Sequence, residues 1–157
     1  MRNCLNAIGF WRCRDWPLLF PHPKELCHLK WNPDEKVKIV RYLDAGLQIN
    51  LQLGYPRCRF GDGPPEEEMG DCERTDGVWV WPEGLSVYVA NYNTMLPDSF
   101  LHHARSKEYV CQNEIDEESI EVYRYSYREW VQWASSVRSN RFLAMASNLR
   151  LRLCPIT

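Results

Sequence analysis

The sequence has no long hydrophobic run, since no stretch approaches the roughly 20 consecutive apolar residues with which a helix crosses a membrane. Its first twenty residues also lack the continuous apolar segment of a secretory signal, because charged side chains interrupt them at Arg2, Arg12, Arg14 and Asp15. We therefore expect a cytoplasmic protein that has no membrane partner.

The chain also lacks a large excess of either charge, with a formal net charge of −2 over 157 residues. Domains that bind nucleic acid usually show a basic excess, so nucleic acid is not an expected partner. The composition, 45% hydrophobic and 25% charged, is that of an ordinary globular protein. No internal repeat or linker divides the chain, which predicts one globular domain over residues 1–157.

Motifs of catalysis and nucleotide binding are missing: the chain has no G-x-S-x-G, no P-loop and no G-x-G-x-x-G. We therefore expect no enzyme activity and no cofactor. The alternative is an enzyme whose site is assembled from distant residues. Its first sign would be a deep pocket that holds His28, His102 or His103 beside a cysteine.

The seven cysteines show neither disulfide-type nor zinc-type spacing, since the number is odd and no C-x-x-C or H-x-x-x-H occurs. Free thiols in a reducing compartment are the expected state, and no metal is predicted. A second alternative remains, in which Cys58, Cys72 and a histidine hold zinc in a structural or interaction module.

Helical and strand patterns alternate along the chain and predict an α+β fold, with several short helices packed on a small, mostly antiparallel sheet. Residues 1–31 are rich in tryptophan and proline and are predicted to form an extended arm. Asn32 and Pro33 predict the start of a helix over residues 33–45, with Val37, Val40 and Leu43 or Asp44 on its buried face. A two-residue period over 47–55 predicts a strand whose polar side faces solvent.

Weaker signals predict the remaining elements. The expected elements are a short strand over 78–81, helical turns over 84–92, a helix from about 97, an extended segment over 120–125, a helix over 127–136 behind a Ser126/Glu129 capping box, and a last strand over 149–153.

The most unusual feature of the chain is a cluster of acidic residues. Residues 56–76 hold several glycines and prolines, which predicts a long loop. Clustered carboxylates on a loop attract basic partners, and nearby indole rings are typical interface anchors. The predicted partner-binding residues are the seven acids of this loop and two tryptophans that share one face of the next strand: Asp62, Glu66, Glu67, Glu68, Asp71, Glu73, Asp76, Trp79 and Trp81. The alternatives are solvated loop charge for the acids and core packing for the indoles.

Several motifs between Pro21 and His102 resemble a group of small, uncharacterised bacterial proteins. They are RCRF at 57–60, TDGVWVWPEGL at 75–85, YV at 88–89 and LPDSF at 96–100. Members of that group often carry further cysteine and histidine residues that look like a zinc knuckle. The corresponding positions here are Gly61, Val87 and Tyr92, so the resemblance implies that packing has replaced the metal site.

The resemblance implies a small cytoplasmic bacterial protein and brings no established activity with it. Together with the acidic loop, it leads us to expect a non-enzymatic protein-binding module. Small bacterial proteins of this kind are often partners of toxins. The narrower expectation is therefore an immunity-type protein that neutralises a basic toxin or effector domain.

Overall fold

The computed structural model describes residues 4–13, 19–27, 31–111 and 124–152, with side chains as far as Arg141. Five strands and four α-helices lie in this part of the chain, and they confirm the predicted α+β class. The strands are β1 (Cys4–Ala7), β2 (Leu47–Ile49), β3 (Glu73–Thr75), β4 (Trp79–Pro82) and β5 (Arg124–Ser126). The helices are α1 (Pro33–Asp44), α2 (Leu85–Tyr92), α3 (Asp98–Ser106) and α4 (Arg128–Arg152), with short 3-10 turns η1 (Pro23–Leu26) and η2 (Glu66–Met69).

The strands form one mixed sheet in the order β2-β3-β4-β1-β5. Strand β3 pairs antiparallel with β2 and β4, whereas β1 pairs parallel with β4 and β5. The sheet therefore has four strands that run in one direction, and β3 alone opposes them. An interior position for β1 corrects the expected arm over residues 1–31, because the apolar residues of β1 precede the proline-rich stretch that suggested an arm.

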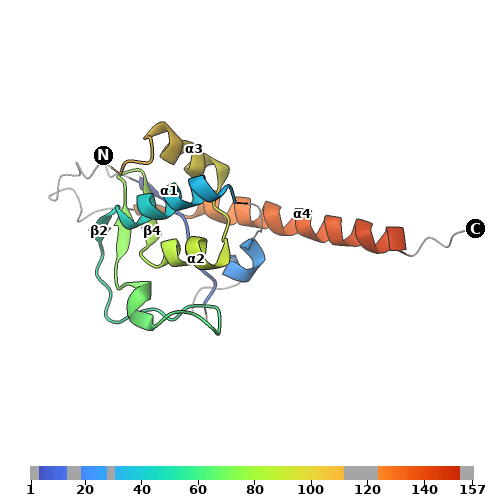
Figure 1. Ribbon diagram of the computed structural model, residues 1–157, viewed down its shortest axis with the longest axis horizontal. Coiled ribbons are helices and arrows are strands. Elements are labelled where there is room, and N and C mark those ends of the chain that lie inside the picture. Colours follow the sequence, from blue (N-terminus) through green and yellow to red (C-terminus); the bar gives the residue numbers. More distant parts are fainter. Residues whose placement is uncertain (1–3, 14–18, 28–30, 112–123, 153–157) are drawn as a thin grey trace, which may run out of the picture.

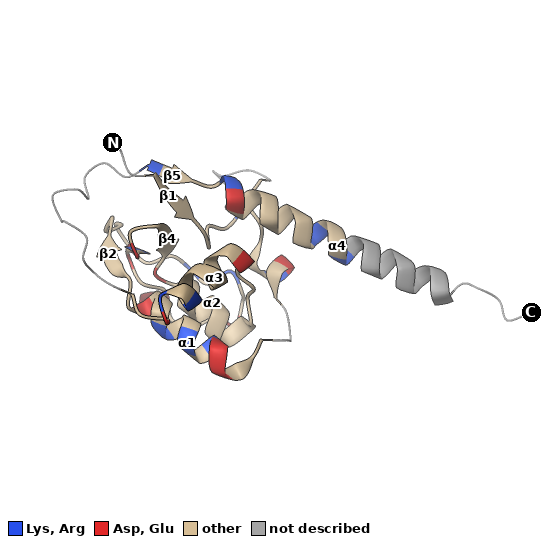
Figure 2. Cartoon of the chain, turned by 90° about the horizontal axis from the view of Figure 1, so that it is seen from above, with Lys and Arg blue, Asp and Glu red and all other residues tan. Residues whose placement is uncertain are grey.

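One face of the sheet is covered by α1, α2 and α3, while α4 starts beside β1 and β5 (Figures 1 and 2). Large side chains fill the space between the sheet and the helices, and those that are fully buried include Tyr42, Trp81, Phe100 and Trp130. Edge-to-face contacts order these rings, since Phe100 lies 5.5 Å from Trp79 and 5.9 Å from Trp81. The aromatic residues thus build the main core.

The opposite face of the sheet is partly buried because the sheet itself curves. Leu5, Ile49 and Val80 are buried on this face, and Tyr125 packs against them. The Tyr125 hydroxyl, on β5, donates to the Glu73 carboxylate on β3, although β4 and β1 lie between these strands. A flat sheet would hold such strands about 14 Å apart, so the sheet curls like part of a barrel.

The predicted helix over residues 33–45 is confirmed as α1. Asn32 caps it, since its Oδ1 accepts a hydrogen bond of 3.0 Å from the Glu35 N–H. The expected buried face is confirmed at Leu43, and Val40 packs against the core, but it is wrong at Val37, which is exposed while Ile39 is buried. Lysines and valines alternate here, which blurs the helical period.

Two predicted strands differ from the structure. The strand expected over 47–55 ends at Ile49, because Asn50 adopts a left-handed conformation with φ of 48°. The strand expected over 149–153 is wrong for residues 149–152, which belong to α4 (Figure 1). Leucine and arginine are strong helix formers, and four alternating residues are too few to favour a strand. Residues 120–123 and 153 lie outside the described residues.

Candidate functional site

The seven acids expected to form one exposed surface are divided by the structure into two groups. Asp62 and the three acids of η2, Glu66, Glu67 and Glu68, are exposed. Asp71 is half-buried, whereas Glu73 is buried in β3 and only 3% of the Asp76 side chain is accessible. Residues 66–69 and 73–75 form η2 and β3, so the expected continuous loop over 56–76 is also corrected.

Asp76 organises the turn between β3 and β4. Its Oδ1 accepts hydrogen bonds from the Val78 N–H at 2.9 Å and the Trp79 N–H at 2.7 Å. Its Oδ2 accepts one from the Tyr42 hydroxyl at 2.6 Å and lies 3.1 Å from Nε2 of His103. Through these four contacts, one nearly inaccessible carboxylate connects the turn to α1 and α3. Asp76 is therefore not available to a partner protein.

Trp79 and Trp81 are buried, which corrects their expected role as partner-binding residues. Trp79 is 4% exposed, Trp81 is fully buried, and both point towards the helices. The Trp81 indole N–H also donates a 3.1 Å hydrogen bond to the Leu43 carbonyl at the end of α1. Because a same-face pair in a strand pattern fits core and surface equally well, the sequence did not distinguish the two placements.

One group of potential metal ligands occurs among the residues that the structure describes. It comprises Asp71, Cys72 and Glu83, whose ligand atoms lie within 4.8 Å of one another. The Arg74 guanidinium already neutralises Glu83, to which its Nε donates at 3.1 Å. Burial favours the neutral acid, but hydrogen bonds from Arg74 and Cys72 outweigh it and lower the pKa of Glu83. A resident arginine opposes the entry of a second cation.

The thiol of Cys72 is equally poorly suited to a metal. Burial, the hydrogen bond that the thiol donates to Glu83 and the charge of that carboxylate raise its pKa to about 12. Metal ions bind the thiolate, which is scarce at neutral pH in such a site. Cys58 belongs to no described group of three ligands, and His28 lies outside the described residues.

We expect the protein to retain no stoichiometric zinc after incubation with one equivalent of Zn²⁺ and dialysis at pH 7. Elemental analysis measures this directly, with Cys72→Ser and Cys58→Ser as companion samples. Retention of one equivalent by the unsubstituted chain, lost in the Cys72→Ser protein, would contradict the expectation and restore the zinc-supported alternative.

Cys58 lies in an aromatic cluster instead. Phe60 and Tyr92 stack with ring centroids 3.8 Å apart, and the Cys58 thiol is 3.8 Å from the Tyr92 hydroxyl. The Tyr88 hydroxyl accepts a 2.8 Å hydrogen bond from the Arg59 N–H. Ring stacking therefore joins residues 58–60 to α2.

An exposed apolar stripe next to η2 was not expected from the sequence. Beyond Asn50 the chain leaves the sheet, so that Leu51 is 78% exposed, Leu53 is fully exposed and Tyr55 is 46% exposed. The two-residue period placed the whole apolar set on the buried side. Leu47 and Ile49 lie there as expected, whereas the apolar residues beyond Asn50 lie outside the strand and are exposed.

Known proteins give no further guide. No family model, curated protein or solved structure matches the chain. Function is therefore inferred from the geometry of the chain itself. Within its described part, no helix is both long and apolar enough to cross a bilayer.

Proposed function

We propose that this protein is a non-enzymatic protein-binding module that docks a basic partner through one acidic and apolar surface. We call this surface the docking face and define it by Leu51, Leu53, Tyr55, Glu66, Glu67 and Glu68. The proposal is carried by the exposure of three large apolar side chains in a row beside three exposed carboxylates. Exposed apolar patches with a polar rim are typical of interaction sites.

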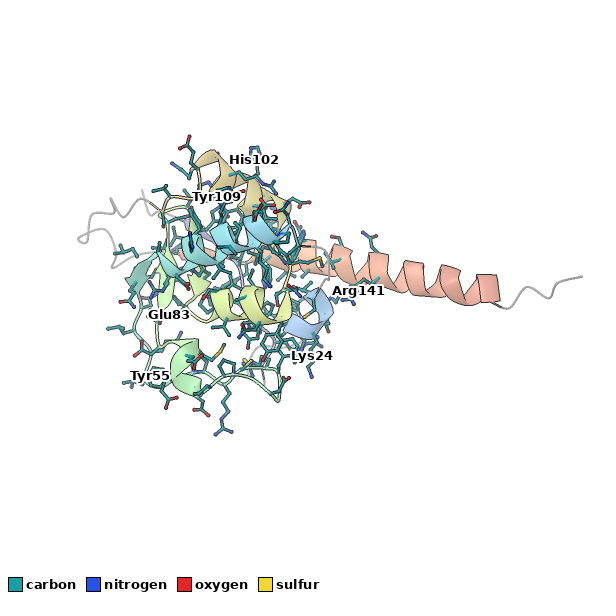
Figure 3. All side chains as sticks on the ribbon, viewed as in Figure 1. Lys24, Tyr55, Glu83, His102, Tyr109 and Arg141 are labelled. Carbon is teal, nitrogen blue, oxygen red and sulfur yellow. The ribbon has the colours of Figure 1, made fainter. Side chains whose placement is uncertain are left out.

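The two parts of the docking face lie side by side. The Gln52 N–H donates a 2.6 Å hydrogen bond to the Asp71 carbonyl just after η2, and Nε of Arg57 lies 2.7 Å from Oε1 of Glu66 at its start. The segment from Gln52 to Arg57 therefore runs along η2 in the opposite direction. In Figure 3, Tyr55 lies beside η2, at the end of the molecule that is opposite His102.

The charge of the docking face indicates a basic partner. Glu66 is paired with Arg57, but Glu67 and Glu68 have no ion-pair partner among the described residues. Exposed carboxylates of this kind speed the approach of a cationic protein, while burial of the leucine and tyrosine side chains would supply affinity. Asp62 adds a further exposed negative charge in the same loop.

The narrower form of the proposal is an immunity-type protein that neutralises a basic bacterial toxin or effector domain in the cytoplasm. The charge of the docking face favours such a partner. The cysteines support a reducing compartment, since Cys4, Cys13, Cys27, Cys58, Cys72 and Cys111 are all free thiols.

We expect Glu67→Lys/Glu68→Lys to weaken partner binding about tenfold or more, because the double reversal replaces attraction by repulsion. Leu51→Ser/Leu53→Ser should weaken it as well, but with little change in its dependence on salt. The measurement is quantitative affinity capture from extracts of the producing organism, followed by titration of the captured partner at two salt concentrations.

The matched control is Asp44→Lys/Glu108→Lys, which makes the same change in net charge at two exposed positions away from the docking face. This control should bind like the unsubstituted protein. The proposal fails if both docking-face variants bind the partner with unchanged affinity. It also fails if the control loses as much affinity as Glu67→Lys/Glu68→Lys.

A further inference from the structure

A pocket of about 340 Å³ opens at the edge of the sheet where the parallel strands end. Phe10 and Trp11 line it just after β1, Pro82 lines it at the end of β4, and Tyr127 lines it just after β5. Its volume falls in the range of small-molecule sites. Ligands of sheets with parallel strands commonly bind at the carboxyl ends of those strands.

The walls of the pocket are aromatic and are held in place by each other. The Tyr127 ring meets Phe10 edge to face at 5.2 Å and Phe20 at 5.3 Å, while Trp11 meets Tyr88 at 5.2 Å. These contacts fix the rings before any ligand arrives. A planar ring system could then stack against them without first ordering the walls.

A cationic group stands at the mouth of the pocket. Arg57 and Arg59 both line it, but Arg57 is engaged by Glu66. The Arg59 backbone is fixed through the hydrogen bond to Tyr88, and its guanidinium has no hydrogen bond or ion pair with any described residue. It is therefore free to bind a carboxylate with two parallel hydrogen bonds.

The pocket also has one buried acceptor, the carboxylate of Glu73. Its Oε2 accepts hydrogen bonds from the Tyr125 hydroxyl and, at 3.0 Å, from Nδ2 of Asn50. Within the described ranges no donor contacts Oε1. Oε1 is therefore open to a ligand that brings an N–H or O–H group into the pocket.

From these three features we propose that the pocket binds a planar aromatic carboxylate that carries a hydrogen-bond donor at its opposite end. The rings lie against Trp11, Phe10 and Tyr127, the carboxylate pairs with Arg59 at the mouth, and the donor reaches Glu73. This pocket borders the docking face, since Arg57 lines the pocket and pairs with Glu66, but it shares none of the six residues that define that face. Gln52 lines the pocket, whereas the exposed Leu51 and Leu53 are not among its lining residues.

The probe is 6-hydroxy-2-naphthoate, a flat bicyclic acid with its hydroxyl and carboxylate at opposite ends. Isothermal titration calorimetry compares it with 2-naphthol, which lacks the carboxylate, and 2-naphthoate, which lacks the hydroxyl. We expect the probe to bind about tenfold more tightly than either of these compounds. Backbone amide shifts on titration should concentrate on residues 9–13 and 52–59.

Two pairs of variants locate the site. Arg59→Gln should weaken binding of the probe about tenfold and leave binding of 2-naphthol unchanged. Arg41→Gln, a substitution at an exposed position outside the pocket, should change the affinity for neither compound. Gln52→Trp should fill the pocket and abolish binding, whereas Leu53→Trp on the exposed side should not. Both replaced positions are exposed, so folding should be preserved.

Equal affinity for the three compounds overturns the proposed ligand class, and so does an Arg59→Gln effect that is as large for 2-naphthol as for the probe. Absence of binding at millimolar probe, or binding that survives Gln52→Trp, overturns the site itself.

Discussion

Trp81→Ala should lower the free energy of unfolding by about 4 kcal/mol, because it empties the space of one of the two fully buried tryptophan side chains in the core. The indole stacks over Tyr42 at 6.2 Å, packs against Phe100 and donates to the Leu43 carbonyl. Alanine would lose these contacts and leave that carbonyl without its partner. Since domains of this size have about 5–15 kcal/mol in total, the variant should be close to unfolding at 37 °C.

Urea titration followed by circular dichroism measures this effect. Trp81→Phe keeps part of the ring packing and should lose about half as much unfolding free energy. The loss can therefore be measured in this variant even if the alanine variant does not fold. Val78→Ala is the control in the turn just before β4, since Val78 is 43% exposed and its replacement should change stability by less than about 1 kcal/mol. A Trp81→Ala loss no larger than the Val78→Ala loss would show that Trp81 does not hold the core together.

Asp76→Ala should lower the free energy of unfolding almost as much, by about 3–4 kcal/mol, because three donors lose their acceptor and two of these bonds are partly buried. The Val78 and Trp79 amides and the Tyr42 hydroxyl would all lose their bond to Asp76. Asp76→Asn keeps an oxygen for the two amides and should cost less, about 1–2 kcal/mol. Exchange of the Val78 and Trp79 amide protons should accelerate in the alanine variant.

The control for this series is Asp62→Ala, which removes an exposed carboxylate of the same loop and should leave stability nearly unchanged. Equal losses for Asp62→Ala and Asp76→Ala would contradict a structural role for Asp76. A loss for Asp76→Asn as large as that for Asp76→Ala would instead assign the effect to the negative charge rather than to the turn.

Local signals predicted the elements whose ends carry distinctive residues. Asn32 with Pro33 predicted the start of α1, and Pro82 predicted the end of β4. Residues 84–92 were expected as helical turns before Asn93, which is the left-handed residue that ends α2. In each case the side chain or φ angle of a single residue decides the backbone locally, so no knowledge of distant contacts was needed.

The structure differs from the expectation where contacts between residues distant in the sequence determine burial. Strand β3 lies in a charged segment, and Glu73 becomes a core residue only because the sheet curls and brings Tyr125 to it. Its neighbour Arg74 is half-buried against Glu83 for a similar reason. The orientation of Leu51 and Leu53 depends on one backbone angle at Asn50. None of these features has a local signature in the sequence, so the candidate surface and pocket emerged only from the fold.

The interior position of β1 has a consequence for biosynthesis. Residues 4–7 are translated well before both neighbours of this strand, β4 and β5. Until then Leu5 and Ala7 have no partner, and the nascent chain must keep an aggregation-prone segment unpaired. Such long-range pairing slows folding. Chaperone dependence during translation should therefore be pronounced for this chain.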